Sequence, residues 1–166
     1  KYNKIKGSKQ RLSFQDLKNI IKEIPFSRPA YLIALNHHQT HPPLHEKLDL
    51  IKTIFAKTNP HIQNLNVRIE NLSNGYNIDL SSNPDISSFD ALKGLPINKL
   101  NIQNSHINDA QLINDLIVKE IDMRNTRIPK LGLILSMKDL RFLTISKDDH
   151  VNWDFKHYPR VTVSRK

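Results

Sequence analysis

A repeat of 21 or 22 residues dominates the second half of the sequence. Three segments share one pattern: IDLSSNPDI at 78–86, LNIQNSHI at 100–107 and IDMRNTRI at 121–128. Each opens with an apolar–polar–apolar triplet, carries a small polar residue five places after its start, and closes on isoleucine. A weaker fourth copy begins at Leu143. Such spacing is typical of stacked repeats, because one short unit cannot bury its apolar face alone.

The pattern within each copy predicts a strand, a turn and a short helix. The triplet fits a strand with its apolar side chains inward, and the spacing of three that follows fits a short helix or 3₁₀ turn. The small polar residue, Asn83, Ser105 or Thr126, lies where the chain turns, and there it can bond unpaired backbone groups. The alternative is a βαβ domain with coincidental spacing, which three copies in register argue against. The apolar residues at every third position are Ile86, Phe89, Leu92 and Leu95, then Ile107, Ala110, Ile113 and Leu116, then Ile128, Leu131, Ile134 and Met137.

The segment LKGLPINKLNIQNSHI, residues 92–107, resembles the leucine-rich repeats of a group of bacterial proteins, in which Gly-Leu-Pro precedes the strand. Thr126 holds the threonine place of that repeat, although the later copies lack Gly-Leu-Pro. The preceding segment resembles the entry to such repeats, where a helix ends at an Asn-Pro like Asn59-Pro60 and an Asn-Gly like Asn74-Gly75 opens the first strand. The resemblance covers residues 50–147.

This resemblance implies an α/β fold, a short leucine-rich-repeat solenoid of about four repeats with parallel strands on its concave face. Many of the similar proteins are Ser/Thr protein kinases that carry the repeats C-terminally. The resemblance therefore implies a signalling module of a larger, kinase-linked bacterial protein. This chain itself shows no glycine-rich phosphate loop and no His-Arg-Asp triplet. It begins at Lys1 rather than Met, so we expect a piece of a longer protein.

Charge separates the first third of the chain from the rest. Residues 1–60 hold 11 lysines and arginines against 4 acidic residues, whereas residues 61–166 hold 14 against 12. Amphipathic patterns predict helices at 13–24, 28–38 and 43–60, which suit a cap over the exposed end of the first repeat. The expected organisation is a basic flexible lead-in at 1–12, a helical N-terminal cap at 13–60, leucine-rich repeats at 61–150 and a C-terminal cap at 151–166.

The C-terminal segment leaves the repeat pattern. It predicts a strand at 160–163, and its aromatic residues Trp153, Phe155 and Tyr158 suit a closing cap better than a ligand cage.

Four histidines, His37, His38, His41 and His45, cluster between the second and third expected helices. A metal site would need three or four converging ligands, and Pro42-Pro43 interrupts the helix that would align them. Asp49 also stands where a zinc-peptidase motif would place its second histidine. We interpret the cluster as a polar loop whose histidines face solvent or cap a helix, and we assign no metal, no cofactor and no catalytic residue.

The expected binding surface is the concave face, where outward residues of successive strands form columns. Its charges have both signs, and Phe142 is its exposed aromatic residue, which suits a protein or peptide better than a phosphate backbone. The columns are Asn77, Lys99, Glu120 and Phe142, then Asp79, Asn101, Asp122 and Thr144, then Ser81, Gln103, Arg124 and Ser146.

Three classes of function follow. We favour a non-catalytic interaction module, whose partner and oligomeric state the sequence leaves open. Nucleic-acid or other polyanion binding through the basic segment KYNKIKGSKQR is the alternative, although no RNA-reading motif follows it. An enzyme is disfavoured, because no catalytic motif is recognisable. The absence of cysteine is compatible with any compartment. The compartment therefore stays open, and the cytoplasm is favoured only because the chain has no signal-peptide pattern and no apolar run near the ~20 residues of a membrane span.

Overall fold

A computed structural model describes Asn19 and residues 44–81, 83–126, 128–148 and 154–166 of the chain. The chain divides into two compact units, residues 1–50 and 51–166. The basic lead-in, the helices expected at 13–24 and 28–38, and the aromatic Trp153 lie outside the described residues.

Helix α4 (Leu44–Thr58) confirms the helix expected at 43–60. Its apolar residues Ile51, Ile54 and Phe55 are buried, which fits one apolar stripe at helical spacing. The helix ends just before Pro60, because proline cannot donate the next backbone hydrogen bond. None of the described helices is both long enough and apolar enough to cross a membrane.

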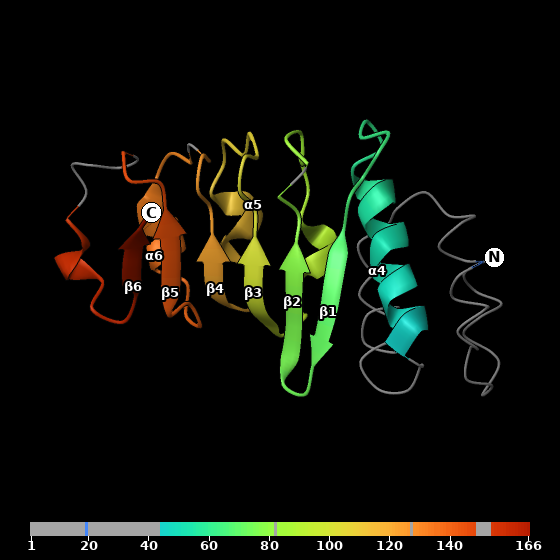
Figure 1. Cartoon of the computed structure of the whole chain (residues 1–166), viewed down its shortest axis with the longest axis horizontal. Helices are drawn as coiled ribbons and strands as arrows, with labels where there is room; N and C mark the ends of the chain where they lie inside the picture. Colours follow the sequence, from blue (N-terminus) through green and yellow to red (C-terminus); the bar gives the residue numbers. More distant parts are fainter. Residues whose placement is uncertain (1–18, 20–43, 82, 127, 149–153) are drawn as a thin grey trace, which may run out of the picture. The chain divides into compact units, whose positions relative to one another are not determined.

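The chain folds as a mixed α/β protein with a six-stranded, mostly parallel sheet. The strands lie in the order in which they occur in the sequence (Figure 1). The first two form an antiparallel hairpin, and every later neighbouring pair is parallel. The strands are β1 (Arg68–Leu72), β2 (Gly75–Asp79), β3 (Ile97–Asn101), β4 (Val118–Asp122), β5 (Phe142–Ile145) and β6 (Thr162–Arg165).

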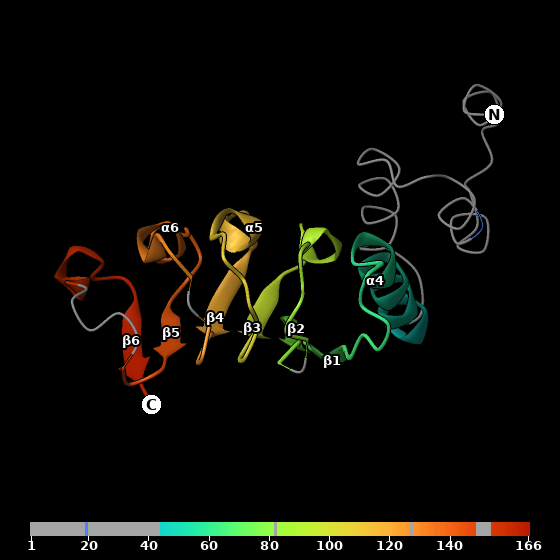
Figure 2. The same cartoon turned by 90° about the horizontal axis from the view of Figure 1, so that it is seen from above.

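Short helices follow the parallel strands and cover one face of the sheet (Figure 2). The helices after β2, β3 and β4 occur where residues spaced by three predict a short helix or turn, whereas the helix after β5 lies outside the predicted runs. The apolar side chains of the first three meet the inward side chains of the strands, so the core lies between these two layers. The helices are η1 (Asp90–Leu92), α5 (Gln111–Asn114), α6 (Leu131–Leu135) and η2 (Phe155–His157).

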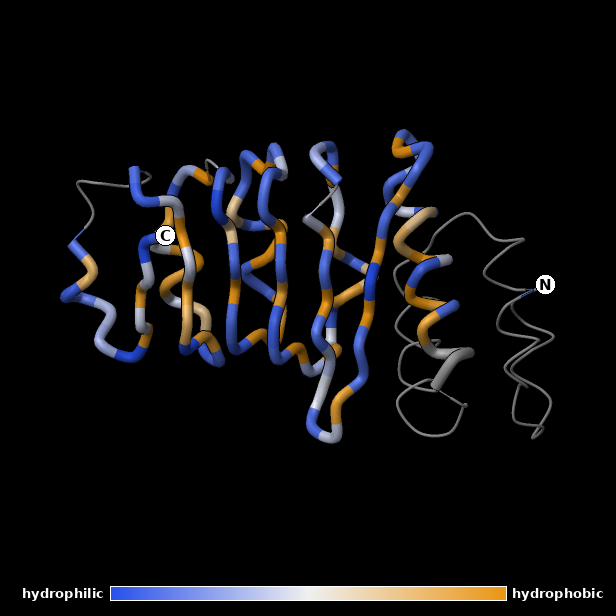
Figure 3. Tube along the Cα trace, viewed as in Figure 1, coloured by the Kyte–Doolittle hydropathy of each residue, from blue (hydrophilic) through white to orange (hydrophobic). Residues whose placement is uncertain are grey.

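The alternation of apolar and polar residues along each strand decides which side chains enter this core (Figure 3). Ile78, Leu100, Ile121 and Leu143, which start the triplets, are all buried. The residues expected at every third position after the triplets are buried too, which confirms that prediction. They are Ile86, Phe89, Leu92, Leu95, Ile107, Ala110, Ile113, Leu116, Ile128, Leu131, Ile134 and Met137.

The small polar residue at the turn bonds backbone groups, as predicted, and is buried in all three copies that carry it. The amide of Asn83 donates to the Leu80 carbonyl, and the hydroxyl of Ser105 donates to the Ile102 carbonyl. Thr126 also donates to the Ile102 carbonyl, at 2.9 Å, although Ile102 belongs to the preceding copy. These side chains therefore satisfy carbonyls that the turns leave unpaired.

The β1–β2 hairpin explains the Asn74-Gly75 pair. Strand β2 begins at Gly75, as the resemblance predicts, with a φ of 141°. A Cβ at this position would collide with the Pro96 carbonyl, which accepts the hydrogen bond of the Tyr76 N–H at 2.9 Å. Glycine is therefore required both by the backbone conformation and by the close approach of Pro96.

The last strand differs from its prediction. It spans Thr162–Arg165 instead of 160–163, so the predicted range is wrong by two residues. The Val161 N–H bonds the Tyr158 carbonyl and closes a turn, and pairing starts where the Thr162 N–H donates to the Arg141 carbonyl at 2.8 Å. The alternation of valine and threonine fits either range, whereas the register with β5 selects the later one.

Candidate functional site

One face of the sheet, which we call the strand face, points away from the short helices (Figure 2). Parallel pairing in register converts the repeat of 21 or 22 residues into rows of outward side chains that cross neighbouring strands. The structure aligns the first two predicted columns in register, and β6 extends both of them, although Asp122 and Thr144 of the second are buried and not exposed as expected. The third predicted column, Ser81, Gln103, Arg124 and Ser146, lies beyond the ends of the strands. The rows are Asn77, Lys99, Glu120, Phe142 and Thr162, and Asp79, Asn101, Asp122, Thr144 and Ser164.

Strand β1 adds two charged residues that the sequence prediction did not include. Arg68 pairs with Asp79 in the register and Glu70 pairs with Asn77, so both lie at the β1 end of the two rows. The Asn74-Gly75 pair could have indicated strand β1, because an Asn-Gly flanked by alternating residues is typical of a hairpin. It predicts that a strand precedes the pair as well as following it.

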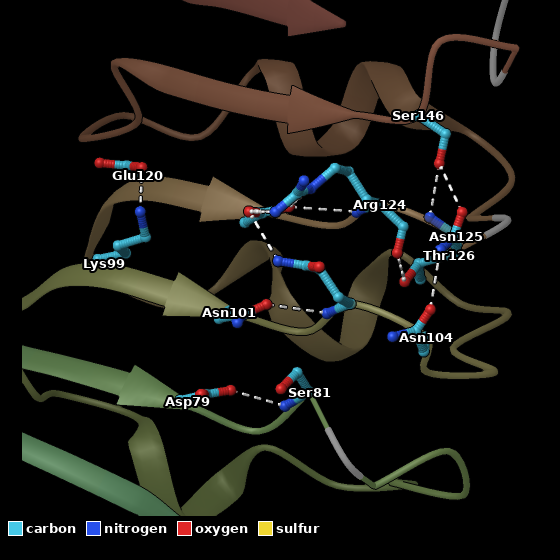
Figure 4. A network of polar contacts seen from close by, with 12 residues as sticks. Asp79, Ser81, Lys99, Asn101, Asn104, Glu120, Arg124, Asn125, Thr126 and Ser146 are labelled. Atoms are coloured by element: carbon cyan, nitrogen blue, oxygen red, sulfur yellow. Dashed lines mark hydrogen bonds and ion pairs between the residues drawn. The ribbon is translucent and has the colours of Figure 1, made fainter. Parts of the chain in front are cut away.

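Lys99 and Glu120 form an ion pair across strands β3 and β4, with 2.8 Å between Nζ and Oε1 (Figure 4). Both side chains remain substantially exposed, so the pair is screened by water and contributes little to stability. Its consequence for binding is that each residue offsets the charge of the other.

Asp122 is buried and has two partners on the strand face. It accepts hydrogen bonds from the Arg124 guanidinium, at 3.0 Å from Nε and 2.9 Å from Nη2, and from Nε2 of Gln103 at 2.9 Å. The hydrogen bond and the charge of Asp122 raise the pKa of Arg124 above its ordinary value. Asp122 therefore holds Gln103 and Arg124 in place, which reduces the entropy that a ligand must offset on binding.

A polar ladder runs along the edge of the sheet where the strands end (Figure 4). Nδ2 of Asn125 donates to Oδ1 of Asn104 at 2.8 Å, and the Ser146 hydroxyl donates to Oδ1 of Asn125 at 3.1 Å. Asn104 and Asn125 have φ values of 58° and 56°, a left-handed conformation that asparagine tolerates better than most residues. The ladder links the ends of neighbouring repeats along this edge of the strand face.

A shallow hollow of 350 Å³ lies at the β1 end of the strand face. Its polar groups are partly satisfied already, because Nδ2 of Asn77 donates to Glu70 and Oδ1 of Asp79 accepts from the Ser81 N–H, both at 2.9 Å. Four of the predicted binding residues, Asn77, Asp79, Lys99 and Asn101, line the hollow. The full lining is Arg68, Ile69, Glu70, Asn77, Ile78, Asp79, Lys99 and Asn101.

Phe142 lies on β5, three strands away from β2, and its side chain is 54% exposed. This confirms the exposed aromatic residue that the columns predict. Its neighbours in the row are Glu120 and Thr162. Tyr76, at the start of β2, is half-buried, and burial raises the pKa of its hydroxyl, so it adds no charge at neutral pH.

The arrangement favours noncovalent recognition: a preformed polar surface, a hollow at one end and an exposed aromatic ring at the other. Within the part of the chain that the structure describes, no three histidine, aspartate or glutamate side chains are placed to hold a metal ion. The side chains of the histidine cluster, His37, His38, His41 and His45, lie outside that part. Comparisons with protein-family models, curated proteins and solved structures find no match to this chain.

Proposed function

We propose that the chain is a non-catalytic interaction module, a short leucine-rich-repeat solenoid whose strand face binds a protein or peptide. Three features support the solenoid: strands paired in parallel at the repeat spacing, a short helix after each of β2 to β5, and a buried polar residue, Asn83, Ser105 or Thr126, at three of the turns. Membership of a larger, kinase-linked bacterial protein is proposed from the sequence resemblance alone.

One observation carries the binding proposal: side chains on neighbouring strands form continuous rows that the described helices leave uncovered. The strands beneath these rows are paired with their neighbours, and contacts such as that between Asp122 and Arg124 hold the side chains in place. A well-ordered surface with one exposed aromatic anchor is typical of sites where a few residues supply most of the binding energy.

The size of the strand face fits a short extended segment. A ligand that crosses from the hollow at β2 to Phe142 on β5 passes three inter-strand gaps, or about 14 Å at the usual strand spacing. Four or five extended residues cover about that length. The ligand would place one side chain in the hollow and another against Phe142.

Selection of peptides from a random display library on the immobilised full chain tests this proposal, with Phe142→Ser as the variant. Ile117→Ser is the matched control, because Ile117 is also an exposed large apolar residue, 44% exposed, but lies outside the rows of the strand face. We expect selected peptides to bind the Phe142→Ser chain about tenfold more weakly and the control as tightly as wild type. Selected peptides that bind all three chains equally well would place the binding surface elsewhere.

The alternative, binding of a polyanion through residues 1–12, falls outside the described residues and stays a prediction. It predicts that a labelled single-stranded oligonucleotide binds the full chain. This binding should weaken steeply as the salt concentration rises, and it should be lost when residues 1–11 are removed. Binding that survives this removal would exclude the basic segment as the site.

A further inference from the structure

Two basic residues lie beside Phe142 on the strand face. Lys119 precedes Glu120 on β4, and Arg141 directly precedes Phe142 at the start of β5. Their backbones touch, because the Arg141 N–H donates to the Lys119 carbonyl at 2.8 Å. Both side chains are exposed, and each directly precedes a residue of the row, Glu120 or Phe142, so the two cations lie along the edge of the strand face where β4 and β5 begin.

Neutral oxygen atoms hold these two cations. Nζ of Lys119 donates to Oδ1 of Asn98 at 2.8 Å, and Nη1 of Arg141 donates to the carbonyls of Lys138 and Leu140 at 3.0 and 2.9 Å. In the described part of the chain, neither cation forms an ion pair with a carboxylate. The two positive charges are therefore positioned but not offset.

The other charges near the centre of the strand face are offset. Glu120, the acidic neighbour of Phe142 in the row, pairs with Lys99, and Asp122 pairs with Arg124. The surface around Phe142 thus combines an exposed aromatic ring with a local excess of positive charge. A ligand complementary to it carries an apolar side chain flanked by carboxylates.

We infer that the strand face takes an acidic peptide segment, with an apolar side chain packed on Phe142 and Asp or Glu side chains at Lys119 and Arg141. This inference rests on the proposed function and adds the chemical class of the ligand.

A nucleic acid fits this surface less well. Its phosphates repeat along the whole strand, so beyond the two cations they would meet Asp79 and the ion pairs of Glu120 and Asp122, whose cations are already engaged. A peptide can confine its acidic side chains to the positions of Lys119 and Arg141 and present neutral side chains to the rest of the face.

The composition of the selected peptides tests the inference. Peptides are selected from a random library on the wild-type chain and on the charge-reversed variant Lys119→Glu/Arg141→Glu. We expect wild-type peptides to be enriched in Asp and Glu next to a large apolar residue, and to bind the reversed variant about tenfold more weakly at low salt. Their affinity for the wild type should fall as ionic strength rises.

The control variant Lys130→Glu/Lys156→Glu changes the net charge equally at two exposed residues outside the rows of the strand face. It should bind the acidic peptides as the wild type does. Because Arg141 also bonds backbone carbonyls, the single variant Lys119→Glu is included, and circular dichroism must show the same thermal transition for every chain compared.

Three outcomes would overturn the inference. If peptides selected on the wild type depend on Phe142 but are not enriched in acidic residues, the chain is still an interaction module, but its ligand is not acidic. Failure to select any peptide above an uncoated support would remove the proposed function as well. Binding of a labelled oligonucleotide that is lost in Lys119→Glu/Arg141→Glu but kept in the control would assign the surface to nucleic acid instead.

Discussion

At the scale of single residues, Asn83, Ser105 and Thr126 show how one place in the repeat meets different demands. Asn83 satisfies three backbone groups, because it accepts from the Asn66 N–H and donates to the carbonyls of Asn66 and Leu80. Ser105 donates to a single backbone carbonyl. The first copy needs the larger amide because the segment before it is not a repeat and must be attached by a side chain.

This difference predicts graded costs for the same substitution. Asn83→Ala leaves more partly buried backbone groups unpaired than Ser105→Ala does, so we expect losses of about 2–3 and about 1 kcal/mol in the free energy of unfolding. Urea denaturation followed by circular dichroism measures both. Equal losses would show that Asn83 stabilises the protein through the turn, as Ser105 does, and not through its hydrogen bonds to Asn66.

At the scale of elements, the end of helix α4 is joined to the segment before η1. The ring of Phe55 packs edge-on against Phe89, with centroids 6.2 Å apart. Asn59 is fully buried there; Nδ2 donates to the carbonyls of Phe55 and Ser88, and Oδ1 accepts from the N–H groups of Ser87 and Ser88. One asparagine thus satisfies the helix end and the loop opposite it.

Asn59→Ala removes all four of these hydrogen bonds. We expect it to lower the free energy of unfolding by about 2–4 kcal/mol, because the part-buried backbone groups of Ser87 and Ser88 lose their partners together. The amides of Ser87 and Ser88 should exchange with deuterium faster than in the wild type. Thr58→Ala is the control: its hydroxyl donates to carbonyls of its own helix and accepts from Nδ2 of Asn59 at 3.3 Å, but it bonds neither Ser87 nor Ser88. Exchange at Ser87 should therefore change much less than in Asn59→Ala.

The elements also show what periodicity predicts and what it does not. Helix α4, the triplets and the aligned columns follow from spacing, because pairing in register turns a sequence period directly into rows. Strand β1 was missed because Arg68–Leu72 lies before the first repeat and has no partner at the repeat spacing. The contact between Gln103 and Asp122 joins residues 19 apart, which becomes visible only when the strands are paired.

At the scale of the whole molecule, the sheet of residues 51–166 is a linear array in which each strand pairs only with its neighbours in sequence. Strands β3 and β4 have a paired strand on each side, whereas β1 and β6 have one each. In such an array, stability is the sum of contributions from each repeat and from the interfaces between neighbours. Local unfolding should therefore begin at the ends of the sheet and reach its centre last.

Native-state hydrogen exchange tests this order, with a substitution at the centre and another near the end. We expect the amides of β3 and β4 to exchange slowest in the wild type. Leu100→Ala on β3 creates a cavity among fully buried side chains, so it should cost about 2–5 kcal/mol and accelerate exchange in every strand. Leu143→Ala, at an equally buried position on β5, should accelerate β5 and β6 more than β3, because β3 keeps its interfaces with β2 and β4. If both substitutions accelerate all strands by the same factor, the sheet unfolds as one cooperative unit, and the nearest-neighbour description does not hold for this chain.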